Sequence, residues 1–470
     1  MTAPVAGSQA RNFLALGGGE AVSRLVAFAT ILLLARRLGP ENYGIIAFAA
    51  GVTLYFAKLA EFALDYVGVA AVAAATGAVD RLGSVLLTAR FLATAIVVGV
   101  AVLAAHWLLP EPDRTVLSLY LLTLLPVAAN PRWLLIGLRD ARAVGGVRVA
   151  GELLALAVVF LAVRTGTELW AAPVAVGTAE LLAVVVLLAV LRLGGHRLRP
   201  ALDRGLVVPV ARRAASIVAL SLLGLVIYNS GLLFLRGLRD AESAGQYAAA
   251  FTLIGFLANL GLAYAMTLIP GLARLRHAPG EARDLYGRSL ALVYAAALPL
   301  AVGGWMLAGR IIELGFGAGY QSAGTALAIL AWAIPLMSLR NVPLAALVAG
   351  DRQHLLLRAT AIAVAVSLVL NLALIPPLGI RGAAIASVAT ESLAGILTLW
   401  YAARDGLGFV PLRQLWKPLV AGAVMAGALW FSARLPLPAT GLIGAGSYLA
   451  ALAALGGLRL RRGTLPQLDS

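Results

Sequence analysis

Charged side chains occur inside several stretches of this sequence that are otherwise apolar. The basic ones are Arg24, Lys58, Arg90, Arg132 and Arg340, and the acidic ones are Glu20, Glu61, Asp65, Glu152, Glu180 and Glu391. An apolar stretch of roughly 20 residues can cross a bilayer, and a charge at its centre costs roughly 2.5–3.5 kcal/mol. We therefore expect these side chains to face a water-filled cavity or a partner.

Arginine in such a cavity indicates an anionic ligand. The guanidinium group stays charged at any physiological pH and binds phosphate through two parallel hydrogen bonds. Arg24 lies near the middle of the first stretch, and Glu20 lies four residues earlier on the same helical face. Two interpretations of Arg24 stay open: a contact to a phosphate or sugar of the substrate, and a structural ion pair with Glu20.

The second stretch places Lys58, Glu61 and Asp65 on one helical face, at spacings of three and seven residues from the first. This face either lines a cavity or lies near the cytoplasmic surface, where Asp65 is merely hydrated. We assign Lys58 and Glu61 to substrate contact and Asp65 to ion coupling.

Two more arginines lie beside prolines. Arg132 follows an Asn-Pro pair, and Arg340 begins an Arg-Asn-Val-Pro segment at the matching place in the second half of the chain. Proline frees a backbone carbonyl and kinks a helix, which favours a polar cavity. We assign both to substrate binding, although an interfacial position fits Arg132 equally. Arg90 is expected to extend back to the membrane surface.

The remaining polar candidates have weaker assignments. Glu152 and Glu391 are suited to carry a proton or sodium ion, and Asn259 to contact a sugar hydroxyl. Structural pairing or hydrogen bonds between helices explain all three equally well. The four histidines are dispersed and form no metal-ligand spacing. The sequence predicts no catalytic residue, metal or cofactor.

Composition describes the class of protein. Hydrophobic residues make up 61% of the chain and charged residues 12%, against about 25% charged in soluble domains. With no cysteine, the chain has no disulfide, thiolate metal site or cysteine nucleophile. The net charge of +16 comes from basic residues spread over many short loops, whereas a nucleic-acid binder would gather them on one soluble face.

We predict an all-α polytopic membrane protein with about 14 transmembrane helices. The expected spans are 13–35, 43–66, 83–109, 115–137, 147–163, 171–191, 214–235, 247–270, 289–308, 323–349, 355–376, 383–403, 418–433 and 438–457. Alternating sides from a cytoplasmic start gives about 23 Lys/Arg inside and about 9 outside, as the positive-inside rule requires. Both termini are then cytoplasmic.

A weak internal repeat divides the chain. Residues 35–48 and 235–251 each combine a basic residue leaving a span, a carboxylate in a short loop, and a tyrosine opening the next span. Transporters are often built from two such halves. The predicted domains are a first lobe (1–191), a basic cytoplasmic linker (192–213), a second lobe (214–403), and two final spans with a tail (404–470).

Three segments carry a resemblance to a known family. They are Leu34–Gly44 (LARRLGPENYG), Gly315–Ala323 (GFGAGYQSA) and Asn371–Ser387 (NLALIPPLGIRGAAIAS). Together they resemble the polysaccharide flippases of the multidrug/oligosaccharidyl-lipid/polysaccharide exporter superfamily. Ser387 stands where that family usually has threonine. The first span also resembles that of lipid II flippases, with Arg24 at the place of a cavity arginine and Thr30 where a second would stand.

The resemblance implies two six-helix lobes arranged as a V, followed by two C-terminal helices. It implies transport of a lipid-linked oligosaccharide, or a related polyprenyl-linked sugar, across the bacterial plasma membrane by alternating access. Thr30 lacks the second arginine's charge, which argues against lipid II as cargo. Besides this substrate and membrane lipids, a polysaccharide polymerase or glycosyltransferase is a plausible partner. We expect the chain to act as a monomer and to bind no nucleic acid.

Two other classes compete with this interpretation. An ion-coupled multidrug exporter of the same superfamily shares the two-lobe fold, but its cationic cargo would favour cavity carboxylates. A membrane-embedded polymerase or ligase generally has a large outer loop, whereas the outer loops here are short. No phosphate-binding G-x-x-x-x-G-K-[ST] segment occurs, so the chain is not predicted to hydrolyse ATP. We expect a transporter, not an enzyme.

Overall fold

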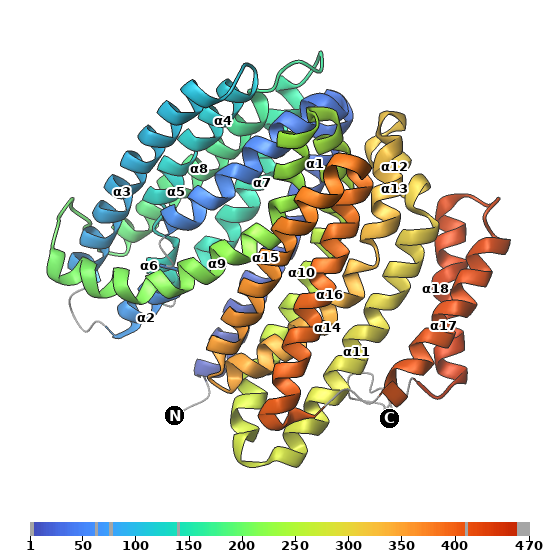
Figure 1. Cartoon of the computed structure of the whole chain (residues 1–470). Coiled ribbons are helices and arrows are strands. Elements are labelled where there is room, and N and C mark those ends of the chain that lie inside the picture. The colour runs from blue at the N-terminus through green and yellow to red at the C-terminus, as the bar shows by residue number, and fades with distance from the viewer. Residues whose placement is uncertain (1–3, 62–63, 75–78, 139–141, 409–411, 458–470) are drawn as a thin grey trace. The chain divides into compact units, whose positions relative to one another are not determined.

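The structure is a computed structural model that describes residues 4–61, 64–74, 79–138, 142–408 and 412–457. Every regular element in these ranges is a helix (Figure 1). The chain divides into two compact units, Met1–Leu225 and Val226–Ser470. Their boundary lies inside the helix Arg204–Leu238, which begins within the basic 192–213 segment, and the assignment of domains itself stays a prediction.

The helices have the following bounds. The first unit contains α1 (Pro4–Glu61), α2 (Val67–Ala74), α3 (Val79–Leu108), α4 (Asp113–Leu122), α5 (Leu124–Ala129), α6 (Arg132–Gly137), α7 (Arg142–Ala162) and α8 (Ala171–Leu193), and α9 (Arg204–Leu238) continues into the second. The second unit contains α10 (Ala241–Arg274), η1 (Leu275–His277), α11 (Pro279–Met306), α12 (Ala308–Phe316), η2 (Ala318–Tyr320), α13 (Gln321–Leu330), α14 (Ala333–Ala349), α15 (Gln353–Leu378), α16 (Ile380–Ala402), η3 (Ala403–Leu407), α17 (Leu412–Phe431) and α18 (Leu437–Ala454).

The described residues contain 11 helices long and apolar enough to cross a membrane. Residues 318–330 and α14 are separated by a short break and are inclined to each other by 44°. If this pair is counted as one span, the number of spans is twelve. The apolar part of α17, Leu415–Phe431, is shorter than a full span. The chain is thus an all-helical multi-pass membrane protein. The expected count of fourteen and the cytoplasmic position of the termini are not confirmed.

Helix α1 explains part of the difference in the count. The sequence predicts a loop between spans 13–35 and 43–66, whereas the backbone is helical from Pro4 to Glu61 except at Gly39. Gly39 has φ 74°, a conformation that costs glycine little, and Pro40 then restarts the helix without losing an amide hydrogen bond. A single residue therefore separates the two expected spans, and Gly18–Glu61 counts as one helix.

The predicted repeat is supported by a contact that both units make. In the first, Nη1 of Arg37 donates to the carbonyl oxygens of Phe160 (2.6 Å) and Val163 (2.7 Å), where α7 ends. In the second, Arg239 donates to the carbonyl oxygens of Ile375 and Pro376, near the end of α15. The last carbonyls of a helix lack amide partners, so a guanidinium group at this place satisfies them.

The loop after α7 is held in place by the segment of α1 around Gly39 and by a carboxylate of its own, Glu168. Asn42 Nδ2 donates to the carbonyl oxygen of Gly166 at 2.9 Å. Hydrogen bonds from the hydroxyl and amide of Thr165 and the amide of Gly166 to Glu168 lower the pKa of that carboxyl to about 2. Residues 38–42 (LGPEN) therefore help to fix the position of the loop after α7 in this unit.

Helices α15 and α16 meet at a glycine that leaves no room for a side chain. A Cβ on Gly382 would lie 2.1 Å from the carbonyl oxygen of Leu374, a backbone atom that has no rotamer to move. We expect Gly382→Ala to lower the free energy of unfolding by about 2–3 kcal/mol, the range of overpacked cores. Thermal unfolding in detergent measures the change.

The matched control for this substitution is Gly427→Ala. Gly427 lies inside α17, and a Cβ there would meet no atom within 4 Å. Alanine should leave stability unchanged or raise it by up to about 1 kcal/mol, because it favours the helix. Equal melting temperatures for the two alanine variants would refute the close approach at Gly382.

Candidate functional site

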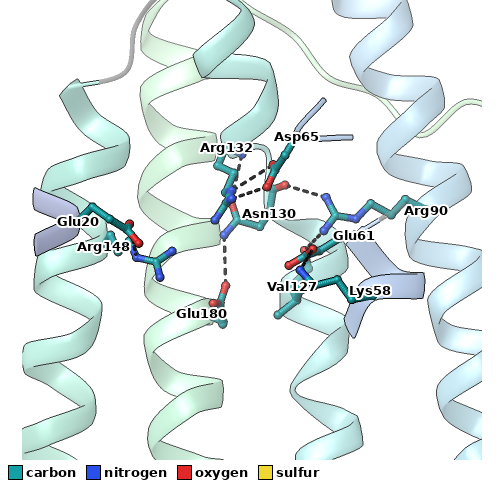
Figure 2. Close-up of polar contacts among 10 residues, drawn as sticks. All are labelled: Glu20, Lys58, Glu61, Asp65, Arg90, Val127, Asn130, Arg132, Arg148 and Glu180. Carbon is teal, nitrogen blue, oxygen red and sulfur yellow. Dashed lines mark hydrogen bonds and ion pairs between the residues drawn. The ribbon is translucent and has the colours of Figure 1, made fainter. Parts of the chain in front are cut away.

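A polar cluster lies inside the first unit, among side chains from α1, α3, α6, α7 and α8 (Figure 2). It includes most of the charged residues that the sequence predicts to lie within spans. Its members are Glu20, Lys58, Glu61, Asp65, Arg90, Asn130, Arg132, Arg148 and Glu180. Each basic side chain in it contacts either a carboxylate or backbone carbonyls.

Arg132 forms an ion pair with Asp65 that uses two nitrogens. Its Nε lies 3.2 Å from Oδ1 of Asp65, and its Nη2 contacts Oδ2. The two side chains are 38% and 30% exposed, so the pair is neither fully buried nor freely hydrated. A guanidinium fork that holds two carboxylate oxygens has the geometry that also holds two phosphate oxygens.

The Asn-Pro break before α6 positions this arginine. Pro131 has no amide hydrogen, and the side-chain oxygen of Asn130 caps the new helix by accepting from the amide of Arg132 at 3.1 Å. The Asn130 amide nitrogen donates to Glu180 Oε2 on α8 at 3.2 Å. The break therefore connects the Arg132–Asp65 pair with Glu180.

Arg90 has a different role from the one expected. It is 7% exposed, so it does not extend back to the membrane surface. Its nitrogens donate to the carbonyl oxygens of Ala60 (2.6 Å), Val127 (2.7 Å) and Asn130 (3.4 Å). These carbonyls lie at the end of α1 and at the end of α5, where helices stop and amide donors are scarce; Val127 also accepts from the amide of Asn130 at 3.3 Å. Arg90 is a structural cap.

Glu20 forms ion pairs with two arginines. Its Oε1 lies 2.9 Å from Nε of Arg24, and its Oε2 lies 3.2 Å from Nε of Arg148 on α7. The ion pair between Arg24 and Glu20 that the helical spacing allows is therefore present. The three side chains are 40–44% exposed, and Figure 2 shows the terminal nitrogens of Arg148 pointing away from Glu20. One carboxylate between two guanidinium groups leaves the trio with a net positive charge.

Lys58 and Glu61 pair within their own helix. The Nζ of Lys58 lies 2.6 Å from Oε2 of Glu61, and both side chains are about one-third exposed. Asp65 lies beyond the end of α1 and forms its ion pair with Arg132. The three residues that share one face in the sequence are thus divided between two ion pairs.

A small pocket of about 90 Å³ lies between the Asn-Pro break, α7 and α8. Arg132, Arg148, Glu152 and Glu180 line it, so two guanidinium and two carboxylate groups face the same space. Glu152 makes no hydrogen bond or ion pair with the residues that the structure describes. The role predicted for Glu152, to carry a proton or a cation, stays a prediction.

The second unit contains one charged pair from the predicted set. Arg340 Nε on α14 lies 3.4 Å from Glu391 Oε2 on α16, and neither atom makes a hydrogen bond within the described chain. The side chains are 22% and 7% exposed. Asn259 lies outside the residues whose side chains the structure describes, so its predicted contact to substrate stays a prediction.

Other polar residues of this unit connect helices. Ser230 on α9 lies 2.9 Å from the hydroxyl of Ser367 on α15, and Asn371 donates to both side chains. The Asn371 residue that opens the third resemblance segment is therefore a link between α9 and α15. This favours interhelical hydrogen bonding as the role of Ser230.

The sequence analysis did not name Arg148 as a candidate, although this residue lies at the start of the expected span 147–163. Helix α7 begins at Arg142 and carries both Arg148 and Glu152. The spacing of four residues between them was a usable signal, since it places both on one helical face. Among the described residues, no group of three or more His, Cys, Asp or Glu side chains is arranged to hold a metal ion.

Comparisons with known proteins agree with this architecture. Residues 9–276, more than half of the chain, match the family model described as polysaccharide biosynthesis protein. The chain is 23% identical over 353 residues to a putative O-antigen transporter of Escherichia coli (strain K12), covering 71% of this chain and 81% of the relative.

Two solved structures share the fold. A lipid II flippase, MurJ, in an inward closed conformation superposes with a TM-score of 0.74 at 13% identity, covering 94% of this chain and 98% of the other. An inward-facing multidrug resistance transporter of the MATE family superposes with a TM-score of 0.64 at 14% identity, covering 82% and 94%. At these identities the likeness concerns the fold alone.

Proposed function

This chain belongs to the polysaccharide biosynthesis protein family, and from that premise we propose that it is a flippase for lipid-linked oligosaccharides or related polyprenyl-linked sugars. The observation that carries the proposal is the Arg132–Asp65 pair inside the helical bundle of the first unit. Its forked guanidinium group is suited to a phosphate, and the name of the O-antigen transporter relative indicates a sugar-bearing cargo.

The mechanism we infer is an exchange of partners. A diphosphate headgroup that reaches Arg24, Arg132 or Arg148 replaces a carboxylate on the guanidinium group. The released Glu20 or Asp65 then carries a charge without its arginine partner in a partly exposed site, which favours uptake of a proton or cation. Substrate binding and ion binding would thereby be linked, with Glu152 and Glu391 as further coupling groups and Lys58, Glu61, Arg340 and Asn259 as further substrate contacts.

The rest of the proposal concerns arrangement. The chain would lie in the bacterial plasma membrane with fourteen spans and both termini in the cytoplasm. The lobes 1–191 and 214–403 would alternate in access around a central cavity, with two C-terminal helices beside them. It would act as a monomer and as a transporter only, alongside a polysaccharide polymerase or glycosyltransferase.

The test is headgroup movement in proteoliposomes with a fluorescent polyprenyl-diphosphate oligosaccharide. We expect Arg24→Ala and Arg132→Ala to lower the rate at least about ten-fold, since each removes a charge-assisted bond of roughly 1.5–3 kcal/mol. Arg164→Ala is the control, because Arg164 is exposed and its Nε donates only to a carbonyl of its own helix end. Wild-type rates in both cluster variants would remove these residues from the site while leaving flipping itself intact.

A multidrug exporter is the second candidate. The balance of carboxylates and cations in the cluster favours it more than the sequence alone does, and a multidrug transporter shares the fold. Its cargo is expected to be an organic cation that binds Asp65, Glu152 or Glu180. Uptake of a fluorescent cation, together with no movement of any lipid-linked sugar, would replace the flippase proposal with this one.

A further inference from the structure

The segment between α8 and α9 lies extended along one face of α3. Three side chains of α3, spaced four residues apart, accept hydrogen bonds from backbone amides spaced two residues apart. The bonds are Arg197 N to Asp80 Oδ2 (2.8 Å), Arg199 N to Ser84 Oγ (2.9 Å) and Ala201 N to Thr88 Oγ1 (3.2 Å). Four residues of a helix advance about 6.0 Å along its axis, and two residues of an extended chain advance about 6.6 Å. Because these two lengths are similar, every second amide of the segment meets the next acceptor side chain on α3.

This attachment fixes where the arginines of the segment point. Successive side chains of an extended chain alternate in direction, so Arg197 and Arg199 share one side. Together with Arg192 at the end of α8, they line a pocket of about 690 Å³. All three residues are exposed, and none of the three guanidinium groups has a hydrogen bond or ion pair to any residue that the structure describes.

The nearby carboxylate does not neutralise this pocket. Asp80 already accepts from the amide of Arg197, and its Oδ1 lies 2.6 Å from Nδ1 of His196. Asp203 is likewise paired, with Arg81 at 2.8 Å. The pocket therefore presents three unpaired guanidinium groups on a segment whose backbone is held in place, which is the arrangement that binds phosphate.

The apolar neighbours of the pocket indicate that the phosphate belongs to a lipid. Leu193 is 89% exposed and Leu202 is 66% exposed, on either side of the arginines. Leu188, Leu191 and Leu198 also line the pocket. A segment with exposed leucines beside arginines suits the boundary between headgroups and acyl chains, where a soluble phosphate would gain nothing from the leucines.

We propose that this pocket is a binding site for the phosphate headgroup of an anionic membrane lipid, separate from the polar cluster of the first unit. The three guanidinium groups contact the phosphate, and Leu193 and Leu202 enter the adjoining hydrocarbon. The site attaches the segment between α8 and α9 to the membrane surface. It requires no transport activity and is tested without it.

The absence of cysteine allows a direct test with a single label. A fluorophore on Leu193→Cys is placed in nanodiscs that contain phosphatidylcholine and a few per cent of a lipid with a quencher in its headgroup region. Quenching by labelled phosphatidylglycerol is compared with quenching by labelled phosphatidylcholine at the same mole fraction. We expect the anionic lipid to quench at least three-fold more strongly at limiting mole fraction.

The variant Arg192→Gln/Arg197→Gln/Arg199→Gln should abolish that preference. Its control is Arg274→Gln/Arg288→Gln/Arg358→Gln, which removes the same charge from exposed arginines of the second unit and should keep it. A variant with lysine at the three pocket positions should retain part of the preference for the anionic lipid. Lysine keeps the positive charge but lacks the forked guanidinium group of arginine. The lysine variant keeps the test decisive if the glutamine variant does not fold.

Three outcomes would overturn the proposal. Equal quenching by the two lipids in the labelled protein with all three arginines in place would exclude a headgroup site. Loss of the preference on adding millimolar inorganic phosphate or diphosphate would identify a site for a soluble anion instead. A preference for polyprenyl diphosphate over phosphatidylglycerol at equal mole fraction would assign the pocket to the transported lipid and reject a site for bulk anionic lipids.

Discussion

Replacing Arg90 by leucine is expected to destabilise the first unit strongly. The side chain is 7% exposed and donates to three carbonyls at helix ends. The carbonyl of Val127 also accepts from the amide of Asn130 at 3.3 Å, whereas Arg90 is the only donor found in the described residues for the carbonyls of Ala60 and Asn130. Each buried carbonyl left unsatisfied costs about 1–3 kcal/mol, and we expect a total loss of at least about 3 kcal/mol.

Thermal unfolding in detergent, followed by loss of the monodisperse peak, measures this effect. Arg164→Leu is the control, since its guanidinium group is exposed at a loop and contacts one carbonyl; it should change stability by no more than about 0.5 kcal/mol. If Arg90→Leu unfolded at the same temperature as the control but lost headgroup transport, Arg90 would belong to the transport site and its role as a cap would be wrong.

The second large effect concerns Glu391, whose replacement by glutamine leaves Arg340 charged and without its partner. Removing one member of a buried pair typically costs 3–5 kcal/mol. Because the Arg340 side chain is 22% exposed and can be partly hydrated, we expect about 2–3 kcal/mol. The same thermal unfolding assay measures the loss.

A double replacement separates stability from function. Arg340→Met/Glu391→Leu removes both charges, and well-packed apolar substitutes for a buried pair are often neutral or stabilising. The pair is 3.4 Å apart, and neither Nε nor Oε2 makes a hydrogen bond within the described chain, so it contributes little to stability. We therefore expect the double variant to be about as stable as wild type.

Transport then decides why the two charges are present. A stable double variant that moves no lipid-linked sugar would place the pair in the transport cycle, as the assignments of Arg340 to substrate and Glu391 to ion coupling require. Normal transport by that variant would show that neither residue has those roles. A double variant less stable than Glu391→Gln would instead make the pair a structural element.

Charge balance in the structure extends beyond the Arg24–Glu20 pair that the sequence allowed. The sequence predicted a cationic cavity, whereas Arg24, Arg132 and Arg340 each have a carboxylate within 3.4 Å. An anionic substrate must therefore compete with these carboxylates. Competition of this kind provides a physical basis for coupling transport to a proton or cation, which unpaired arginines would not.

The sequence by itself determined whatever depends on neighbours along the chain. Apolar runs predicted the spans, because hydrocarbon thickness sets their length. The spacing of four residues allowed the Arg24–Glu20 pair, one of the two interpretations of Arg24, and the contacts of Arg37 and Arg239 support the internal repeat. Hydropathy did not reveal that the break between the first two expected spans is a single non-helical residue, Gly39, since a charged, glycine-containing stretch resembles a longer loop.

Only the tertiary structure decided which charges meet across helices. Arg132 pairs with Asp65, Arg148 with Glu20, and Arg340 with Glu391, partners separated by about 50 residues or more. No local pattern specifies such pairs, because they depend on how every intervening helix packs and rotates. Arg90 shows this most clearly: its partners are backbone carbonyls, which every residue carries and no sequence motif identifies.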